Sequence, residues 1–173
     1  MKNLLFFIAI LSFVGCSKED DSYCDCGPGP KPDEKLIVEL LNSSGQNLLL
    51  PYIDNNIPDS SLTFYMIKGN PIKVINLSSF YKTSSFLFEN FQQGNEIKYV
   101  VLNYPWLLQQ SANEKYGSYV IDYNGKFPND TIYLKYDITP NDKIDRIIEV
   151  NVNGIHQETE SINDLHRKLV ITK

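Results

Sequence analysis

Thiols and imidazoles are scarce in this sequence, and their scarcity excludes several kinds of site. The chain has three cysteines and two histidines in 173 residues, and no cysteine follows Cys26. From residue 35 onward the chain therefore has neither a structural disulfide nor a cysteine nucleophile. It also lacks the Gly-x-Ser-x-Gly turn that presents the nucleophile of many serine hydrolases. The residues thus give no support for covalent catalysis, and we expect neither a catalytic residue nor a cofactor.

A surplus of basic residues is missing as well. Sixteen Lys and Arg stand against 21 Asp and Glu, which gives a formal net charge of −5. Nucleic acid is bound through clustered basic side chains that neutralise phosphates. Here the basic residues are spread singly among acidic neighbours, so we expect no nucleic-acid partner.

One long apolar run is present, at residues 4–14, and it follows the basic residue Lys2. A membrane-spanning helix needs about 20 apolar residues, and this run is shorter and is followed by an acidic stretch. The pattern is typical of a secretory signal peptide, which we assign to residues 1–15.

The residues at the end of this run are Val14-Gly15-Cys16, which resemble a bacterial lipobox. The resemblance to bacterial lipoproteins implies that Cys16 carries a diacylglycerol, that the preceding residues are removed, and that the new amino group is acylated. Several acyl chains, at about 0.8 kcal/mol per buried CH₂, hold a protein stably on a membrane. The alternative is an ordinary signal peptide with an incidental cysteine.

The segment after the cysteine has a serine, a lysine and three consecutive acidic residues: Ser17, Lys18, Glu19, Asp20 and Asp21. It is similar to the lysine-plus-acidic export signal of surface lipoproteins in Bacteroidota. That resemblance implies a place on the outer membrane, with the protein facing the cell exterior. The alternative is a solvated charge run that only keeps the chain extended.

Residues 16–34 as a whole are rich in Gly, Pro and acidic residues, which predicts an extended tether. Cys24 and Cys26 lie within it. A disulfide across so short a ring would constrain almost no chain, and a thiolate metal site would need further ligands. Inert thiols and an intermolecular link both remain open.

Residues 35–173 are long enough for one domain with its own core. The whole chain has eleven Tyr and nine Phe, most of them after residue 35, and these residues favour strands over helices, as do the frequent Val, Ile and Thr. Turn-forming residues recur about every ten positions. We therefore predict a single all-β domain of nine to eleven strands, an antiparallel β-sandwich of immunoglobulin-like or transthyretin-like type.

Two turns and one alternating strand are the clearest local signals. Asn124-Gly125 separates the strand-like residues 116–123 and 130–136, and Asn153-Gly154 follows the strand-like residues 144–152, so each predicts a hairpin turn. In the last of these strands, period-two alternation predicts that one set of side chains points inward and the other outward. The inward set is Ile148, Val150 and Val152, and the outward set is Asp145, Glu149 and Asn151.

Two groups of polar residues have side chains that could bind a metal or act in acid-base chemistry. The first joins His156, His166 and Asp164 across the closing strands. The second gathers oxygen ligands for calcium in one loop, but it lacks the EF-hand spacing, and ordinary turn chemistry accounts for these residues equally well. Its members are Asp54, Asn55, Asn56 and Asp59. We predict no metal site from either group.

Aromatic residues in the loop at 103–115, together with Tyr116 just after it, suggest a ligand platform. Tyr104, Trp106 and Tyr116 offer flat rings on which sugars or peptides stack. The alternative is that Trp106 plugs the open end of the core. Separately, Asp130-Thr131-Ile132 fits the O-glycosylation pattern of Bacteroidota, although Thr131 also suits a strand.

These expectations combine into a lipid-anchored envelope protein whose domain binds or scaffolds without catalysis. The membrane is its partner through Cys16, and a glycan or another envelope protein is a further possible partner. A purely structural component and a small envelope enzyme are the alternatives.

We predict that Cys16→Ala abolishes lipidation, because only a thiol at that position accepts the diacylglycerol. Cells supplied with radioactive fatty acid should label the wild-type protein and leave the variant unlabelled. Equal label on both proteins would contradict the lipoprotein assignment.

Overall fold

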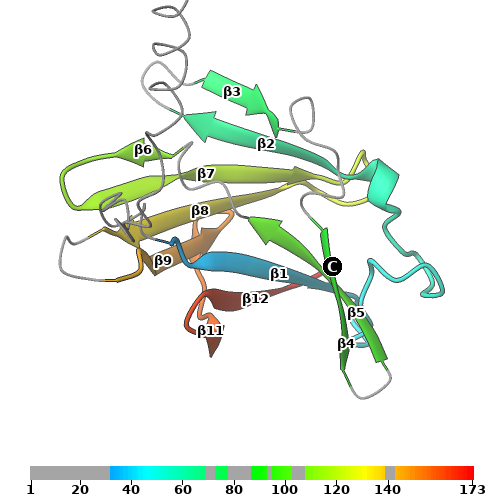
Figure 1. Cartoon of the computed structure of the whole chain (residues 1–173). Helices are drawn as coiled ribbons and strands as arrows, with labels where there is room; N and C mark the ends of the chain where they lie inside the picture. Colours follow the sequence, from blue (N-terminus) through cyan, green and yellow to red (C-terminus); the bar gives the residue numbers. More distant parts are fainter. Residues whose placement is uncertain (1–31, 69–72, 78–86, 93–94, 103–107, 139–142) are drawn as a thin grey trace, which may run out of the picture. The chain divides into compact units, whose positions relative to one another are not determined.

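The computed structural model describes residues 32–68, 73–77, 87–92, 95–102, 108–138 and 143–173 (Figure 1). Contacts divide the chain into residues 1–30 and residues 31–173, and the fold below is that of the second unit. Among the described residues, no helix combines the length and apolar character needed to cross a membrane.

The strands form two sheets, and the helical element with defined bounds among the described residues is the short 3₁₀ turn Asp59–Ser61. The first sheet has the order β11-β12-β1-β5-β4, with β1 (Lys35–Leu41), β4 (Leu87–Gln92), β5 (Asn95–Leu102), β11 (Glu160–Asn163) and β12 (His166–Thr172). The second has the order β10-β9-β8-β7-β2-β3, with β6 beside β7. Its strands are β2 (Thr63–Lys68), β3 (Lys73–Asn76), β6 (Gln109–Gln110), β7 (Glu114–Asp122), β8 (Asp130–Asp137), β9 (Arg146–Val152) and β10 (Ile155–His156).

Side chains from both sheets share one apolar core, so the predicted all-β sandwich is confirmed. Phe64 and Met66 of β2 are buried, while Thr63 and Tyr65 between them are only partly buried, as their alternation predicts. The buried aromatic side chains include Phe64, Tyr119, Tyr123 and Tyr136. Large flat rings on alternating positions therefore supply much of the core.

Both predicted hairpin turns are present. Asn124 and Gly125 have φ angles of 54° and 79°, and Asn153 and Gly154 have φ angles of 52° and 83°. Two successive positive φ angles are the mark of a type I′ turn, which asparagine followed by glycine adopts at little steric cost. These turns join β7 to β8 and β9 to β10 in antiparallel pairs.

One pair departs from the predicted antiparallel arrangement, because β1 and β12 run parallel (Figure 1). In β1 the consecutive residues Leu36, Ile37 and Val38 are all buried. Such an unbroken apolar run is typical of a strand covered on both faces. The last strand, β12, thus lies beside the first strand, β1, inside the sheet and not at its edge.

The alternation predicted for residues 144–152 is wrong in the first half of this segment, before Glu149. Tyr136 pairs with Ile147, and the preceding residue Lys135 pairs with Glu149, so Ile148 is an extra residue in a β-bulge. The bulge shifts the parity: Ile147 becomes buried, and Ile148, predicted inward, is 52% exposed. Asp145, predicted outward, is buried.

The folded unit also begins earlier than the predicted boundary at residue 35. Asp33 bridges to Asp145, and two backbone hydrogen bonds extend this contact, from Glu34 N to Asp145 O and from Asp145 N to Pro32 O. We call residues 32–34 the N-terminal arm. It lies along the start of β9 and was predicted to be the end of the tether.

The bulge predicts that substitution of two neighbouring isoleucines lowers the free energy of unfolding by very different amounts. Ile147→Ala should lower the free energy of unfolding by about 2–5 kcal/mol, because it opens a cavity in the core. Ile148→Ala should change it by less than about 0.5 kcal/mol, as exposed positions usually do. Urea unfolding of both variants measures this, and equal losses would contradict the bulge.

Candidate binding pocket

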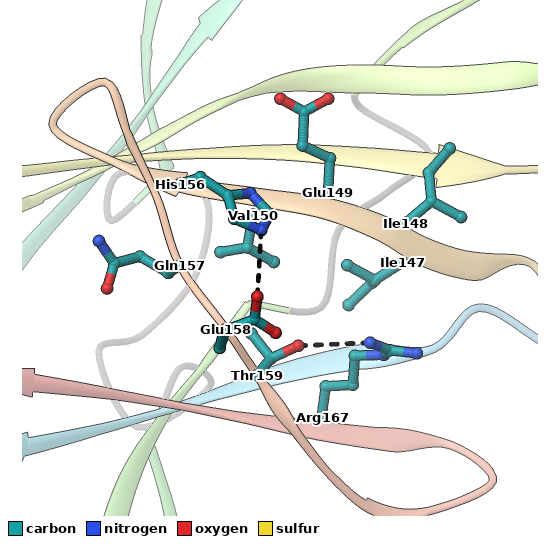
Figure 2. Close-up of a pocket in the computed structure, with 9 residues that line it drawn as sticks. All are labelled: Ile147, Ile148, Glu149, Val150, His156, Gln157, Glu158, Thr159 and Arg167. Carbon is teal, nitrogen blue, oxygen red and sulfur yellow. Dashed lines mark hydrogen bonds and ion pairs between the residues drawn. The ribbon is translucent and has the colours of Figure 1, made fainter.

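A pocket of about 120 Å³ opens where the edges of the two sheets meet (Figure 2). It lies between β9, β10, the connection after β10 and β12. The lining residues are Ile147, Ile148, Glu149, Val150, His156, Gln157, Glu158, Thr159 and Arg167. We call it the seam pocket.

The path of the chain creates this pocket. β10 is the edge strand of one sheet and β11 is the edge strand of the other, so residues 157–159 cross from sheet to sheet. β10 covers only Asn151 and Val152 of β9. The remaining part of β9, with its bulge at Ile148, therefore borders the pocket.

Glu34 of the N-terminal arm fixes the inner side of the seam pocket. Its carboxylate is 1% exposed. Oε1 lies 3.1 Å from Nε of Arg167 and 3.8 Å from Nη1 of Arg146, and Oε2 accepts a 2.8 Å hydrogen bond from the backbone N–H of Ile147. Two lining residues thus depend on one buried carboxylate.

Arg167 extends from Glu34 toward the connection. Its Nη1 donates a 3.3 Å hydrogen bond to Oγ1 of Thr159, which the close-up shows inside the pocket (Figure 2). A guanidinium has five N–H donors in a fixed plane, so donors remain beyond these two contacts for a ligand. Because Glu34 balances its charge, Arg167 does not select for anions alone.

The mouth of the pocket carries a weak ion pair. Nε2 of His156 lies 3.7 Å from Oε1 of Glu158, and these side chains are 62% and 98% exposed. Exposed pairs of this kind are screened by water and salt, so they do little to fix the positions of the two side chains. His156 and Glu158 are therefore available to hydrogen-bond a ligand.

His156, His166 and Asp164, which the sequence analysis weighed as a cluster, are not brought together. His156 lies on β10 and His166 on β12, in different sheets, and Nδ1 of His166 is 2.9 Å from Oδ1 of Asn163. Burial and the charge of Lys35 lower the pKa of His166, which favours the neutral ring. Asp164 contributes its backbone carbonyl to Arg146. Within the described residues, no three His, Cys, Asp or Glu side chains gather as metal ligands.

The loop considered for calcium already holds cationic side chains. Nζ of Lys126 donates to the backbone carbonyl of Asn56, and Nζ of Lys98 lies 3.6 Å from Asp59. Asn55 takes the left-handed conformation, with φ of 58°, which asparagine tolerates in turns. Turn chemistry therefore accounts for this loop.

The aromatic platform is only partly within the described chain. Tyr104 and Trp106 lie outside it, whereas Tyr116 is half-buried on β7 and pairs with Gln109 of β6. Cys16, the export residues Ser17 to Asp21, Cys24 and Cys26 also lie outside the described residues. Their assignments remain predictions.

The candidate glycosylation motif has a structural role at its first residue. Asp130 is buried and accepts hydrogen bonds from Tyr123 at 2.6 Å and Asn153 at 3.0 Å, and it pairs with Lys173 at 2.5 Å. Burial and the bond to Asp130 raise the pKa of Tyr123 well above its usual range. Thr131 is half-buried beside this cluster.

Removing the buried carboxylate should be far more costly than removing an exposed one. Glu34→Ala should lower the free energy of unfolding by about 3 kcal/mol, the lower end for a broken buried pair, because its arginines can still reach water. Glu160→Ala is the control, since its exposed pair with Lys168 should contribute less than about 1 kcal/mol. Urea midpoints at unchanged m-value measure both, and similar losses would contradict the role given to Glu34.

Comparison of this chain with protein-family models, with curated proteins and with solved structures finds no match. The function is therefore argued from the chain's own residues. The seam pocket combines hydrogen-bonding groups with the exposed apolar side chain of Ile148.

Proposed function

We propose that this protein is a lipid-anchored binding module of the bacterial outer membrane, facing the cell exterior and without catalytic activity. The anchor is supported by the lipobox-like Val14-Gly15-Cys16 and the export-signal-like Ser17 to Asp21. The β-sandwich is supported by the fold. Binding is supported by the seam pocket, which is the observation that carries the proposal.

The chemistry of the seam pocket favours a neutral ligand rich in hydroxyl groups. Arg167 donates hydrogen bonds, Glu149 and Glu158 accept them, and Gln157 and Thr159 do both. Carboxylates at the rim repel an anion, and the guanidinium repels a cation. A sugar has alternating donors and acceptors and an apolar ring face, which the exposed Ile148 can contact.

The size of the pocket limits what it receives. Pockets for drug-sized ligands measure about 300–1,000 Å³, and the seam pocket measures about 120 Å³. It therefore accommodates one sugar ring at the end of a longer glycan, while the rest of the chain lies over the edge strands. Weak affinity that multivalent display strengthens is the expected behaviour.

A glycan array tests this proposal with a matched pair of variants. Ile148→Lys introduces a long charged side chain at an exposed residue that lines the pocket. Val74→Lys makes the same change on β3, at the other edge of the same sheet, where Val74 is also exposed. Ile148→Lys should weaken saccharide binding by about tenfold or more, equal to about 1.4 kcal/mol. Val74→Lys should leave it unchanged.

Other outcomes point elsewhere. A folded protein that binds no saccharide on the array would contradict the proposal and favour a structural envelope component. Binding that survives Ile148→Lys but is lost in Trp106→Ala would assign the ligand to the aromatic loop. Conversion of a bound saccharide that stops when His156 and His166 are replaced by Ala would favour the enzyme alternative.

A further inference from the structure

A lysine and two aspartates from three separate segments meet at one end of the sandwich. Nζ of Lys115, on β7, lies 2.8 Å from Oδ1 of Asp33 in the N-terminal arm and 2.7 Å from Oδ2 of Asp145, just before β9. These side chains are 14%, 22% and 8% exposed. The contact is therefore largely shielded from water, unlike the surface ion pairs of the domain.

The lysine is on the core-facing side of its strand. Period-two alternation places Lys115 on the same face as the buried Tyr119 and Ile121, and the register places it directly opposite the fully buried Tyr136. Lys115 and Tyr136 therefore share one face of the sheet, and the amine meets the two carboxyl groups on that face. A low-polarity setting of this kind favours neutral forms of an acid and an amine over their charged forms.

Two carboxyl groups around one amine provide what amide formation requires. One carboxyl group supplies the carbon that is attacked, and the other moves protons. Burial raises the pKa of Asp33, and the neighbouring Asp145 raises it further, against the opposing effect of Lys115. Asp33 is therefore the better acyl group, since a carboxylic acid loses water more readily than a carboxylate.

We propose that Lys115 and Asp33 form an intramolecular isopeptide bond in the folded protein, with Asp145 carrying the protons. This modification does not depend on the function proposed for the seam pocket.

The reaction needs no oxidant, reductant or cofactor. The Asp145 carboxylate takes one proton from the Lys115 ammonium, and the neutral amine attacks Cγ of the Asp33 carboxylic acid. Asp145 passes this proton to the departing hydroxyl, which leaves as water, and then accepts the second proton from the new amide nitrogen. One C–N bond forms, one C–O bond breaks, and Asp145 finally releases its proton to solvent.

Proximity compensates for the small fraction of neutral amine. Burial lowers the pKa of Lys115, but the hydrogen bonds to Asp145 and Asp33 outweigh it and raise the pKa overall. Reacting groups held in contact reach effective molarities of about 10⁵–10⁸ M. Because the bond forms once in the life of each molecule, a slow step is sufficient.

The second buried lysine pair of the domain lacks this arrangement. Lys173 meets Asp130 beside Tyr123 and the carbonyl of Pro128. Within the described part of the chain, Lys173 forms an ion pair with one carboxylate side chain, that of Asp130, whereas Lys115 pairs with two. The pair of Lys173 and Asp130 therefore serves as an internal comparison in the same molecule.

The bond would fasten the arm that follows the tether. Asp33 and Lys115 are 82 positions apart, so the amide would close a large covalent loop. It would fix the N-terminal arm to β7, an inner strand of the second sheet. Any pull through the tether would then act on a covalent link and not on the hydrogen bonds of β1.

Mass spectrometry of the denatured full-length protein tests the proposal directly. The measured mass of the wild-type chain should be one water molecule lower than the mass calculated for the same chain without the isopeptide bond. A tryptic digest should contain one branched peptide that joins Asp33 to Lys115. Lys115→Arg keeps the positive charge but cannot form this amide, so it should retain the water. Lys135→Arg is the control, because Lys135 pairs with one exposed carboxylate, Glu114, and this variant should still lose the water.

The wild-type digest decides the question even if a variant fails to fold. A folded wild-type protein of full mass, with separate linear peptides for Asp33 and Lys115, would overturn the proposal and leave a non-covalent ion cluster. A branched peptide that joins Lys173 to Asp130, with Asp33 and Lys115 in separate linear peptides, would overturn it as well. Asp145→Ala should retain the water while the domain folds, and water loss in this variant would remove Asp145 from the reaction.

Discussion

The docking of the N-terminal arm onto β9 is the constraint on which the other features of this domain depend. Glu34 is buried, and its two oxygens are shared among Arg146, Arg167 and the backbone of Ile147. A buried carboxylate without these partners would be strongly unfavourable. The arm therefore holds the start of β9 and the start of β12 together, and both contribute to the seam pocket.

The two edge strands explain why a pocket forms at this side of the sandwich. A sheet edge exposes unpaired backbone groups, and proteins usually keep such strands short or irregular. Here β10 has two residues, β11 has four, and β9 carries a bulge. These devices limit pairing with other chains, and they also leave a hollow lined by polar side chains. Protection of the edge and space for a ligand thus arise from the same features.

The three proposals concern different parts of one chain and fail independently. Lipidation at Cys16 depends on the first 21 residues, saccharide binding depends on the seam between β9 and β12, and the isopeptide bond depends on Lys115 and two aspartates. They fit a common purpose, because a module that binds outside the cell while its other end is held in a membrane is subject to pulling. The arm at residues 32–34 lies between those two ends in sequence.

Local sequence determined the all-β character, the type I′ turns and the faces of β2, since each depends on side-chain period and turn chemistry within a few residues. It also predicts a location on the outer membrane, through Cys16 and the residues on either side of it. Tertiary structure alone decided the parallel β1–β12 pair, the parity of β9 and the docking of the arm. The extra residue at Ile148 has no signature in the local sequence. From the sequence, Glu34 is one more acidic residue of the tether. Its burial depends on residues more than a hundred positions away, among them Arg146 and Arg167. The seam pocket depends on all three, so period and composition could not predict it.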